Sequence, residues 1–238
     1  MSRAQSHVVG VALMLGIAVV ALGGLTAAVG SLVDAQTATA DAARVADEMD
    51  SALRPVSVTG PHAGAVRFAD GTLSTVDRDL RVLRNGTVVA THSVGGLVFD
   101  AGERRVAFLA GAIVRGSPGN AWLQTPPLVT GSERNAVIAV GVPHLGAGTV
   151  ARSGHGPTTI TLRTNVSHSR RDLGTGRYAV AVETVTPDPF ARHFREANAT
   201  VERRDIDGDD VRSVVATYPG VRRGYLAVHD LALEVDDG

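Results

Sequence analysis

The sequence has no cysteine, which excludes disulfide bridges, thiol catalysis and Cys-ligated zinc. Lysine is also absent: all 23 basic side chains are arginine, and 24 acidic ones bring the formal net charge to −1. A chain this close to neutral lacks the strongly basic surface of general nucleic-acid binders, so we expect no nucleic-acid partner. Aromatic residues make up only 4%, so a core must be built largely from Val, Leu and Ala.

The longest uncharged segment lies near the N-terminus. Residues 8–33 hold 26 consecutive residues without a charge, whereas about 20 suffice to cross a bilayer as a helix. A buried core helix is the alternative, but core helices seldom stay apolar all round for seven turns. A second alternative is a secretory signal peptide, with residues 35–40 (AQTATA) as its cleavage site. We interpret residues 8–33 as a transmembrane helix.

The charges beside this segment predict its orientation. Arg3 and the α-amino group precede it, and the acid-rich stretch from Asp34 to Asp50 follows it. Because positive flanks stay in the cytosol, residues 1–7 should form a cytosolic leader and the rest of the chain should lie outside. We therefore expect a single-pass protein of the cytoplasmic membrane, in contact with membrane lipid.

The residues before the apolar segment carry a family resemblance. The sequence Arg3-Ala4-Gln5-Ser6-His7-Val8-Val9 resembles the prepilin-peptidase site of archaeal type IV pilin-like proteins, especially those of salt-loving archaea. The resemblance implies recognition of Arg3 and Ala4 by a prepilin-type peptidase, cleavage before Gln5 and retention of the helix. It also implies other pilin-like subunits as partners and a place in a cell-surface filament. His7 replaces the proline or glycine common there, and Val9 replaces the acidic residue of bacterial pilins.

Small residues recur along the apolar segment. Gly16, Gly23 and Gly30 are spaced by seven, and Ala12 lies one turn before Gly16. Such a stripe lets two helix backbones approach closely and predicts helix–helix packing. The alternative is that the stripe follows from a composition with 27 glycines.

The helix should continue beyond the membrane. Ala38, Ala42, Val45, Met49 and Ala52 fall on one helical face, and the acidic residues between them fall on the other. A proline at position 55 disfavours helical geometry in the residue before it, so residues 34–54 should form an amphipathic extension. Its apolar face should pack on the remainder of the chain.

Residues 55–238 are expected to form an extracytoplasmic β-rich head. Short apolar or alternating runs separated by Gly, Pro and Asp favour an antiparallel sandwich or meander, so the fold class is α+β. Asn85-Gly86 between two strand-like runs predicts a type I′ hairpin. Asp188-Pro189 predicts the start of one short helix. Residues 146–157 are rich in glycine and predict a loop, which could divide the head into two lobes.

Three N-glycosylation sequons begin at Asn85, Asn165 and Asn198, whereas about 0.7 are expected by chance for this composition. The excess predicts an exported glycoprotein. The hairpin turn already explains Asn85-Gly86, whereas Asn165 and Asn198 are expected in a loop and at a helix end.

The acidic run 205–210 partly matches a calcium loop through Asp205, Asp207 and Asp209. Asp210 stands where such a loop has glycine, and Ala216 where it has glutamate. An acidic turn between strands is therefore the preferred interpretation, with no metal and no cofactor expected.

No nucleophile motif, phosphate-binding loop or H-x-x-x-H pair occurs, so we expect no enzymatic activity. The first hypothesis is a type IV pilin-like subunit, such as a minor pilin, assembled through its helix. The second is a non-polymerising, singly anchored surface protein with a binding head. A tethered extracytoplasmic enzyme is the third.

Overall fold

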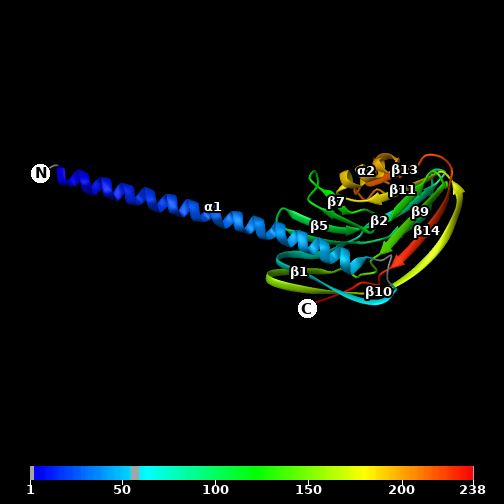
Figure 1. The fold of residues 1–238 in the computed structure, drawn as a ribbon, viewed down its shortest axis with the longest axis horizontal. Helices are drawn as coiled ribbons and strands as arrows, with labels where there is room; N and C mark the ends of the chain where they lie inside the picture. The colour runs from blue at the N-terminus through cyan, green and yellow to red at the C-terminus, as the bar shows by residue number, and fades with distance from the viewer. Residues whose placement is uncertain (1–2, 55–58, 238) are drawn as a thin grey trace. The chain divides into compact units, whose positions relative to one another are not determined.

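The structure is a computed structural model that describes residues 3–54 and 59–237 of the chain (Figure 1). The chain divides into two compact units, Met1–Ala40 and Asp41–Gly238. One helix, α1 (Arg3–Leu53), begins in the first unit and ends in the second. It starts earlier than expected, since residues 3–7 of the expected leader are helical. It ends two residues before Pro55, as predicted.

The second unit is built mainly of β-strands. Within the described residues its larger sheet follows the order β7 (Trp122–Thr125), β6 (Ala112–Arg115), β5 (Arg104–Leu109), β4 (Gly96–Ala101), β1 (Gly60–Val76), β10 (Ala151–Gly176), β14 (Arg222–Asp230), β9 (Val137–His144) and β8 (Val129–Ser132). A tenth strand, β15 (Glu234–Asp237), also pairs with β10. The smaller sheet has the order β12 (Thr200–Arg204), β13 (Ser213–Thr217), β11 (Tyr178–Glu183), β2 (Asp79–Arg84) and β3 (Thr87–Ser93).

The coarse prediction of a mostly antiparallel β unit with one short helix is confirmed. Strands β4 to β7 are consecutive antiparallel neighbours, as in a meander. One pairing differs, because β14 and β9 run parallel. Parallel neighbours need a long connection, and here more than 75 residues separate the two strands. The sandwich alternative stays a prediction.

Two strands are much longer than the sequence predicts. Strand β1 has 17 residues and β10 has 26. Irregular points let them bend without ending: the β1–β10 register shifts between Phe68 and Asp70, and Gly71 has a φ of 144°. The loop expected over residues 146–157 was therefore wrong beyond residue 150, because β10 begins at Ala151.

Local turn and helix signals were more accurate. Asn85 and Gly86 join β2 to β3 with φ values of 52° and 82°, which confirms the hairpin turn. The short helix is α2 (Pro187–Glu196), and it begins two residues before the expected start. Its buried face includes Phe190 and Phe194.

Two large hydrophobic clusters stabilise the unit. The first joins strands of both sheets with Phe190 and Phe194 of α2. The second joins the end of α1 to the larger sheet, around Phe68, Phe99 and Phe108. From α1 it includes five buried residues: Ala42, Val45, Ala46, Met49 and Leu53.

The apolar face expected for the helix extension is therefore confirmed, with two changes. Ala46 and Leu53 join the face, whereas Ala38 and Ala52 are only half-buried. The face is wider than the predicted stripe because strands lie on more than one side of this part of the helix.

Candidate functional site

The first candidate site is the apolar stretch of α1. Among the described residues, Leu13–Gly30 form a window long and apolar enough to cross a membrane, without a charged residue. Its large side chains are open: Met14 is 76% exposed and Val20 is 75% exposed. Soluble monomers rarely leave so continuous an apolar surface uncovered. Lipid or other apolar helices could cover a surface of this kind.

The polar groups of this stretch suit an apolar environment. The backbone amides are hydrogen-bonded within the helix, as any membrane-spanning segment requires. Thr26 is the one residue with a polar side chain in the window, and its Oγ1 donates to the carbonyl of Leu22 at 2.8 Å. The hydroxyl is therefore satisfied by its own helix and needs no water.

The glycines expected to mediate packing are open. A Cβ atom placed on Gly16, Gly23 or Gly30 would meet no atom within 4 Å outside the local helix. The stripe is thus an unfilled surface, on which another helix could approach. Arg3, Ala4, Gln5 and Ala12 lie in α1, where the structure describes only their backbone. Processing before Gln5 stays a prediction.

The second part of α1 uses its carboxylates on the edge of β1. Strand β1 pairs with β10 over Gly60–Ser74 but with β4 only over Thr72–Val76, so one edge of residues 60–71 has no neighbouring strand among the described residues. Asp41 Oδ2 accepts the N–H of Ala69 at 2.6 Å, at the register shift. Glu48 Oε2 accepts the N–H of Arg67 at 2.6 Å. The helix therefore satisfies an otherwise open strand edge.

Two further carboxylates of α1 contact β7, at the edge of the same sheet. Asp47 accepts a hydrogen bond from Gln124 Nε2 at 2.8 Å, and Asp50 accepts one from Thr125 Oγ1 at 3.1 Å. The sequence places these acidic residues outside the predicted apolar face. Asp41 is nevertheless only 3% exposed.

A glycine sets the distance between α1 and β1. A Cβ atom at Gly64 would lie 2.5 Å from Cβ of Ala52, far closer than two carbon atoms can approach. Gly64 therefore allows the helix to reach the strand edge on which Glu48 forms its hydrogen bonds. Sequence reasoning missed this residue, because one glycine among 27 carries no signal of its contact.

The three sequon asparagines are all exposed. Asn85 lies in the hairpin turn, and its Oδ1 accepts the N–H of Arg177 at 2.9 Å. Asn165 lies within β10, so its expected loop position was wrong. Asn198 follows α2 with a φ of 63°, and its Nδ2 donates to Glu133 Oε1 at 2.5 Å. Surface position keeps all three as candidate acceptors, and a glycan on Asn198 would leave one N–H for Glu133.

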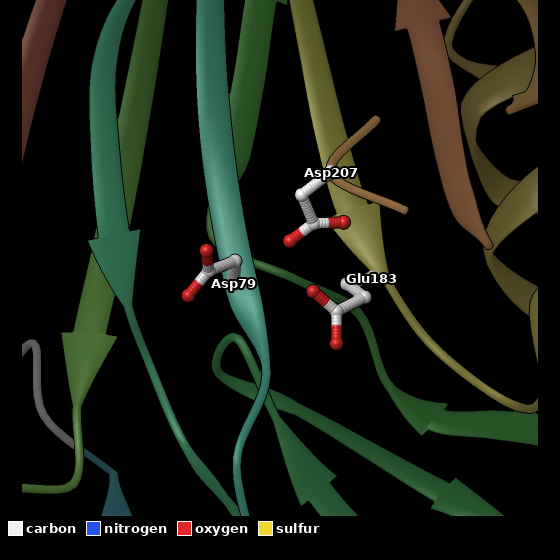
Figure 2. Close-up of side chains that lie close together, drawn as sticks. All are labelled: Asp79, Glu183 and Asp207. Carbon is white, nitrogen blue, oxygen red and sulfur yellow. The ribbon is translucent and has the colours of Figure 1, made fainter. Parts of the chain in front are cut away.

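Three carboxylates converge at one end of the smaller sheet. Asp79, Glu183 and Asp207 come from β2, β11 and the loop after β12, and their oxygens lie within 4.8 Å of one another (Figure 2). The buried guanidinium of Arg81 already lies among them. Its Nη2 donates to Asp79 at 2.7 Å and to Asp207 at 2.5 Å, while Nη1 is 3.7 Å from Glu183. Arg81 therefore supplies the positive charge that a metal ion would bring.

Burial governs the chemistry of Glu183. The residue is 3% exposed, and burial raises the pKa of its carboxyl, with the negative charge of Asp209 adding to the rise. Arg78, 3.8 Å away, acts in the opposite direction. The hydrogen bond from Arg81 to Asp207 holds the loop of residues 205–212 against the sheet, where Ile206 also packs against the cluster formed by Leu83, Ala179, Ala181 and Val215. The arrangement is that of a structural ion network.

The expected calcium residues lie in that loop. Asp205, Asp207 and Asp209 are exposed, and their carboxylate oxygens also lie within 4.8 Å of one another. Asp205 accepts the N–H of Gly208 at 2.8 Å, and Asp209 accepts that of Val211 at 3.0 Å. These local hydrogen bonds are those of an acidic turn between strands, which was the preferred interpretation.

Some histidines acquire partners that the sequence does not indicate. The rings of His168 and His229 meet across β10 and β14 with their Nδ1 atoms 2.8 Å apart. Burial, followed by the charges of His168 and Arg170, lowers the pKa of His229. His144 Nδ1 lies 3.2 Å from Asp230, which also accepts the N–H of Ala232. The Asp230 carboxylate therefore also shapes the turn that follows β14.

Fold and site together define a β-rich protein whose N-terminal helix has an uncovered apolar stretch long enough to span a membrane. Residues 3–234 match the family described as a family of unknown function, DUF7289, and the chain belongs to that family. No curated protein and no solved structure matched the chain.

Proposed function

We propose that this chain is a type IV pilin-like surface subunit, anchored in the cytoplasmic membrane by α1 with its β-rich head outside. The observation that carries the proposal is that two stretches of α1 have different environments. Residues 13–30 are apolar and uncovered, whereas residues 41–53 are part of the core of the head. Because the second stretch is part of the core of the head, we expect the helix to be retained in the mature protein. Cleavage before the apolar segment keeps the whole helix.

The proposal includes cleavage by a prepilin-type peptidase between Ala4 and Gln5. Arg3 and Ala4 would be read by the peptidase on the cytosolic side, where positive flanks remain. Intact-mass spectrometry of the mature protein tests this step: a chain that begins at Gln5 and keeps the helix supports it. A start near residues 38–41 would contradict it. An unprocessed Met1 or Ser2 would favour a simple membrane anchor.

The proposal also includes assembly through the stripe of Gly16, Gly23 and Gly30. Its open surface supports close packing with the same stripe or other small residues of neighbouring helices. Replacement of Gly16 and Gly23 by Leu should remove the chain from sheared surface filaments. Ala21→Leu, on a different face of the same helix, is the matched control and should leave it there.

The second candidate function is a singly anchored surface protein that binds a ligand through its head and does not polymerise. A groove on the larger sheet, described below, favours it. Recovery of the mature chain from membranes, and not from sheared filaments, would support this candidate. Occupancy of the sequons at Asn85, Asn165 or Asn198, measured as added glycan mass, would support exposure outside the cell under either function.

A further inference from the structure

An apolar groove lies on the larger sheet, where β8, β9, β14 and β10 run side by side. Its volume is about 610 Å³, within the range of small-molecule sites. We call it the outer groove and define it by six lining residues: Leu128, Ala139, Gly141, Arg170, Tyr225 and Ala227.

Strand register places five of these residues on one face. Arg170 of β10 is opposite Ala227 of β14, and Gly141 of β9 is beside Ala227 on the other side. Tyr225 is beside Ala139 in the same way. Side chains alternate along a strand, and the intervening Leu226 is buried in the core. The outer groove therefore lies on the face of the sheet that points away from the core.

The floor of the groove is unusually small and apolar for a solvent-facing sheet, where polar side chains are usual. Ala139, Gly141 and Ala227 form it in adjacent strands. Leu128 closes one side, since a Cβ atom at Gly141 would lie 2.7 Å from Cβ of Leu128. Tyr225, 40% exposed, contributes an aromatic ring. The floor and the ring of Tyr225 together form an apolar surface on which a flat ligand can lie.

The rim of the groove is positively charged. Asp172, the nearby acidic residue, is already paired with Arg223, at 3.0 Å from its Nε and 2.5 Å from its Nη2. Arg170 is exposed and forms no ion pair with any acidic side chain in the described part of the chain. His229 lies at the same end and is flanked by Arg170 and His168. A ligand with a negative charge complements this rim.

We propose that the outer groove binds a carboxylate-bearing sugar of an acidic polysaccharide. The C–H face of the sugar ring lies on Tyr225 and the small floor, and Arg170 pairs with the carboxylate in the two-pronged geometry that guanidinium favours. Thr130 and Asp172, on the walls, offer partners for sugar hydroxyls.

The arrangement favours a sugar over an acidic peptide. An extended peptide commonly binds by adding to a free strand edge. Strands β9 and β14, which carry the floor of the groove, each have a neighbouring strand on both sides. The floor therefore presents side chains and no backbone edge to a ligand.

Calorimetric titration of the full-length chain in nanodiscs tests the proposal. The probes are tetragalacturonate, the neutral maltotetraose, tetraglutamate and inorganic phosphate. Tetragalacturonate should bind at least tenfold more tightly than the other three, and its affinity should fall as salt is raised, because part of the attraction is electrostatic. Equal affinity for maltotetraose would overturn the role of charge. Equal affinity for tetraglutamate or phosphate would overturn the assignment to a sugar.

Variants locate the binding. Arg170→Gln and Tyr225→Ala should each weaken tetragalacturonate binding about tenfold or more, corresponding to a loss of about 1.4 kcal/mol. Arg104→Gln removes an equally exposed arginine remote in sequence from the groove and should leave the affinity unchanged. Thermal unfolding of each variant verifies the fold. Unchanged affinity in both groove variants would overturn the site, whatever the outcome for processing or filament assembly.

Discussion

Residues 13–30 and 41–53 of α1 are both helical, yet their environments are opposite. In the first stretch every residue is exposed, although nearly all are apolar. In the second, Val45, Met49 and Leu53 are fully buried, although acidic residues alternate with them. Hydrophobicity alone therefore does not determine which part of the helix joins the core. The difference is made by carboxylates that reach strand edges and by one glycine that lets the helix approach.

The largest effect is expected from introducing charges into residues 13–30, because a charged stretch inserts poorly into lipid. Val19→Arg combined with Leu22→Arg places two charges near the middle of the stretch, each costing about 2.5–3.5 kcal/mol on insertion scales. We expect most of the protein to be lost from the membrane fraction after cell fractionation. Val88→Arg plus Val221→Arg, at exposed apolar positions of the head, are the matched controls and should leave the protein in the membrane.

The second test removes an apolar contact from the buried stretch. Met49→Ala should lower the free energy of unfolding of the head by about 2–5 kcal/mol, because the side chain is fully buried and leaves a cavity. Chemical denaturation in detergent micelles measures it. Met14→Ala makes the same chemical change in the exposed stretch, and an equal loss of stability there would contradict the comparison.

The third test concerns the close approach of α1 to β1. Gly64→Ala should destabilise the head by about 1–3 kcal/mol, since the new methyl group would overlap Ala52. The second change Ala52→Gly should restore most of the loss by removing the atom that clashes. Gly16→Ala, in open space, should have no effect on unfolding of the head. A double variant no more stable than Gly64→Ala alone would show that the overlap is not the cause.

The fourth test concerns the carboxylates of α1, and its effect should be no larger than that of Gly64→Ala. Asp41→Ala should cost about 1–3 kcal/mol, because the N–H of Ala69 loses its acceptor in a partly buried place. Asp47→Ala, which removes a bond to the side chain of Gln124 at an exposed position, should cost less. Equal losses would indicate that the strand edge is hydrated when Asp41 is absent.

The smallest effect is on the pH dependence of stability, and it concerns Glu183 at the end of β11 in the smaller sheet. Its folded-state pKa is raised above the unfolded value, so the folded chain holds an extra proton between the two values. That contribution to stability is complete below the unfolded pKa, near 4.5, and is lost as pH rises through the folded value. The melting temperature of the unaltered chain should therefore include a fall over this pH range. Glu183→Gln should make that fall smaller, whereas Glu202→Gln, at an exposed position, should leave the fall unchanged.

Local chemistry explains what could be predicted from the sequence. The uncharged run, the end of α1 before Pro55, the Asn85-Gly86 turn and the β-rich composition each depend on neighbouring residues. Predictions failed where distant residues decide. Strand β10 continues, with bulges and glycines, through a stretch whose sequence predicts a loop. Strand β14 pairs in parallel with β9, which is distant in the sequence.

The candidate sites follow the same division. The residues of the apolar span and the sequons are visible as patterns, but their environments are not. Asp41 reads as a solvent-facing residue because the open edge of β1 that it satisfies lies 28 residues away. Likewise, no local pattern indicates that Arg81 lies among carboxylates from three segments, or that Tyr225 and Arg170 face the same groove.

The central claim is that α1 has one stretch for an apolar environment and another for the head. The chain has no cysteine, so single-cysteine variants can carry an environment-sensitive fluorophore without background. In liposomes, a probe at Ala21→Cys should be quenched by spin-labelled lipid and protected from iodide. A probe at exposed Ser51→Cys should show the reverse. Equal iodide quenching at both positions, with no quenching by lipid at position 21, would contradict the account.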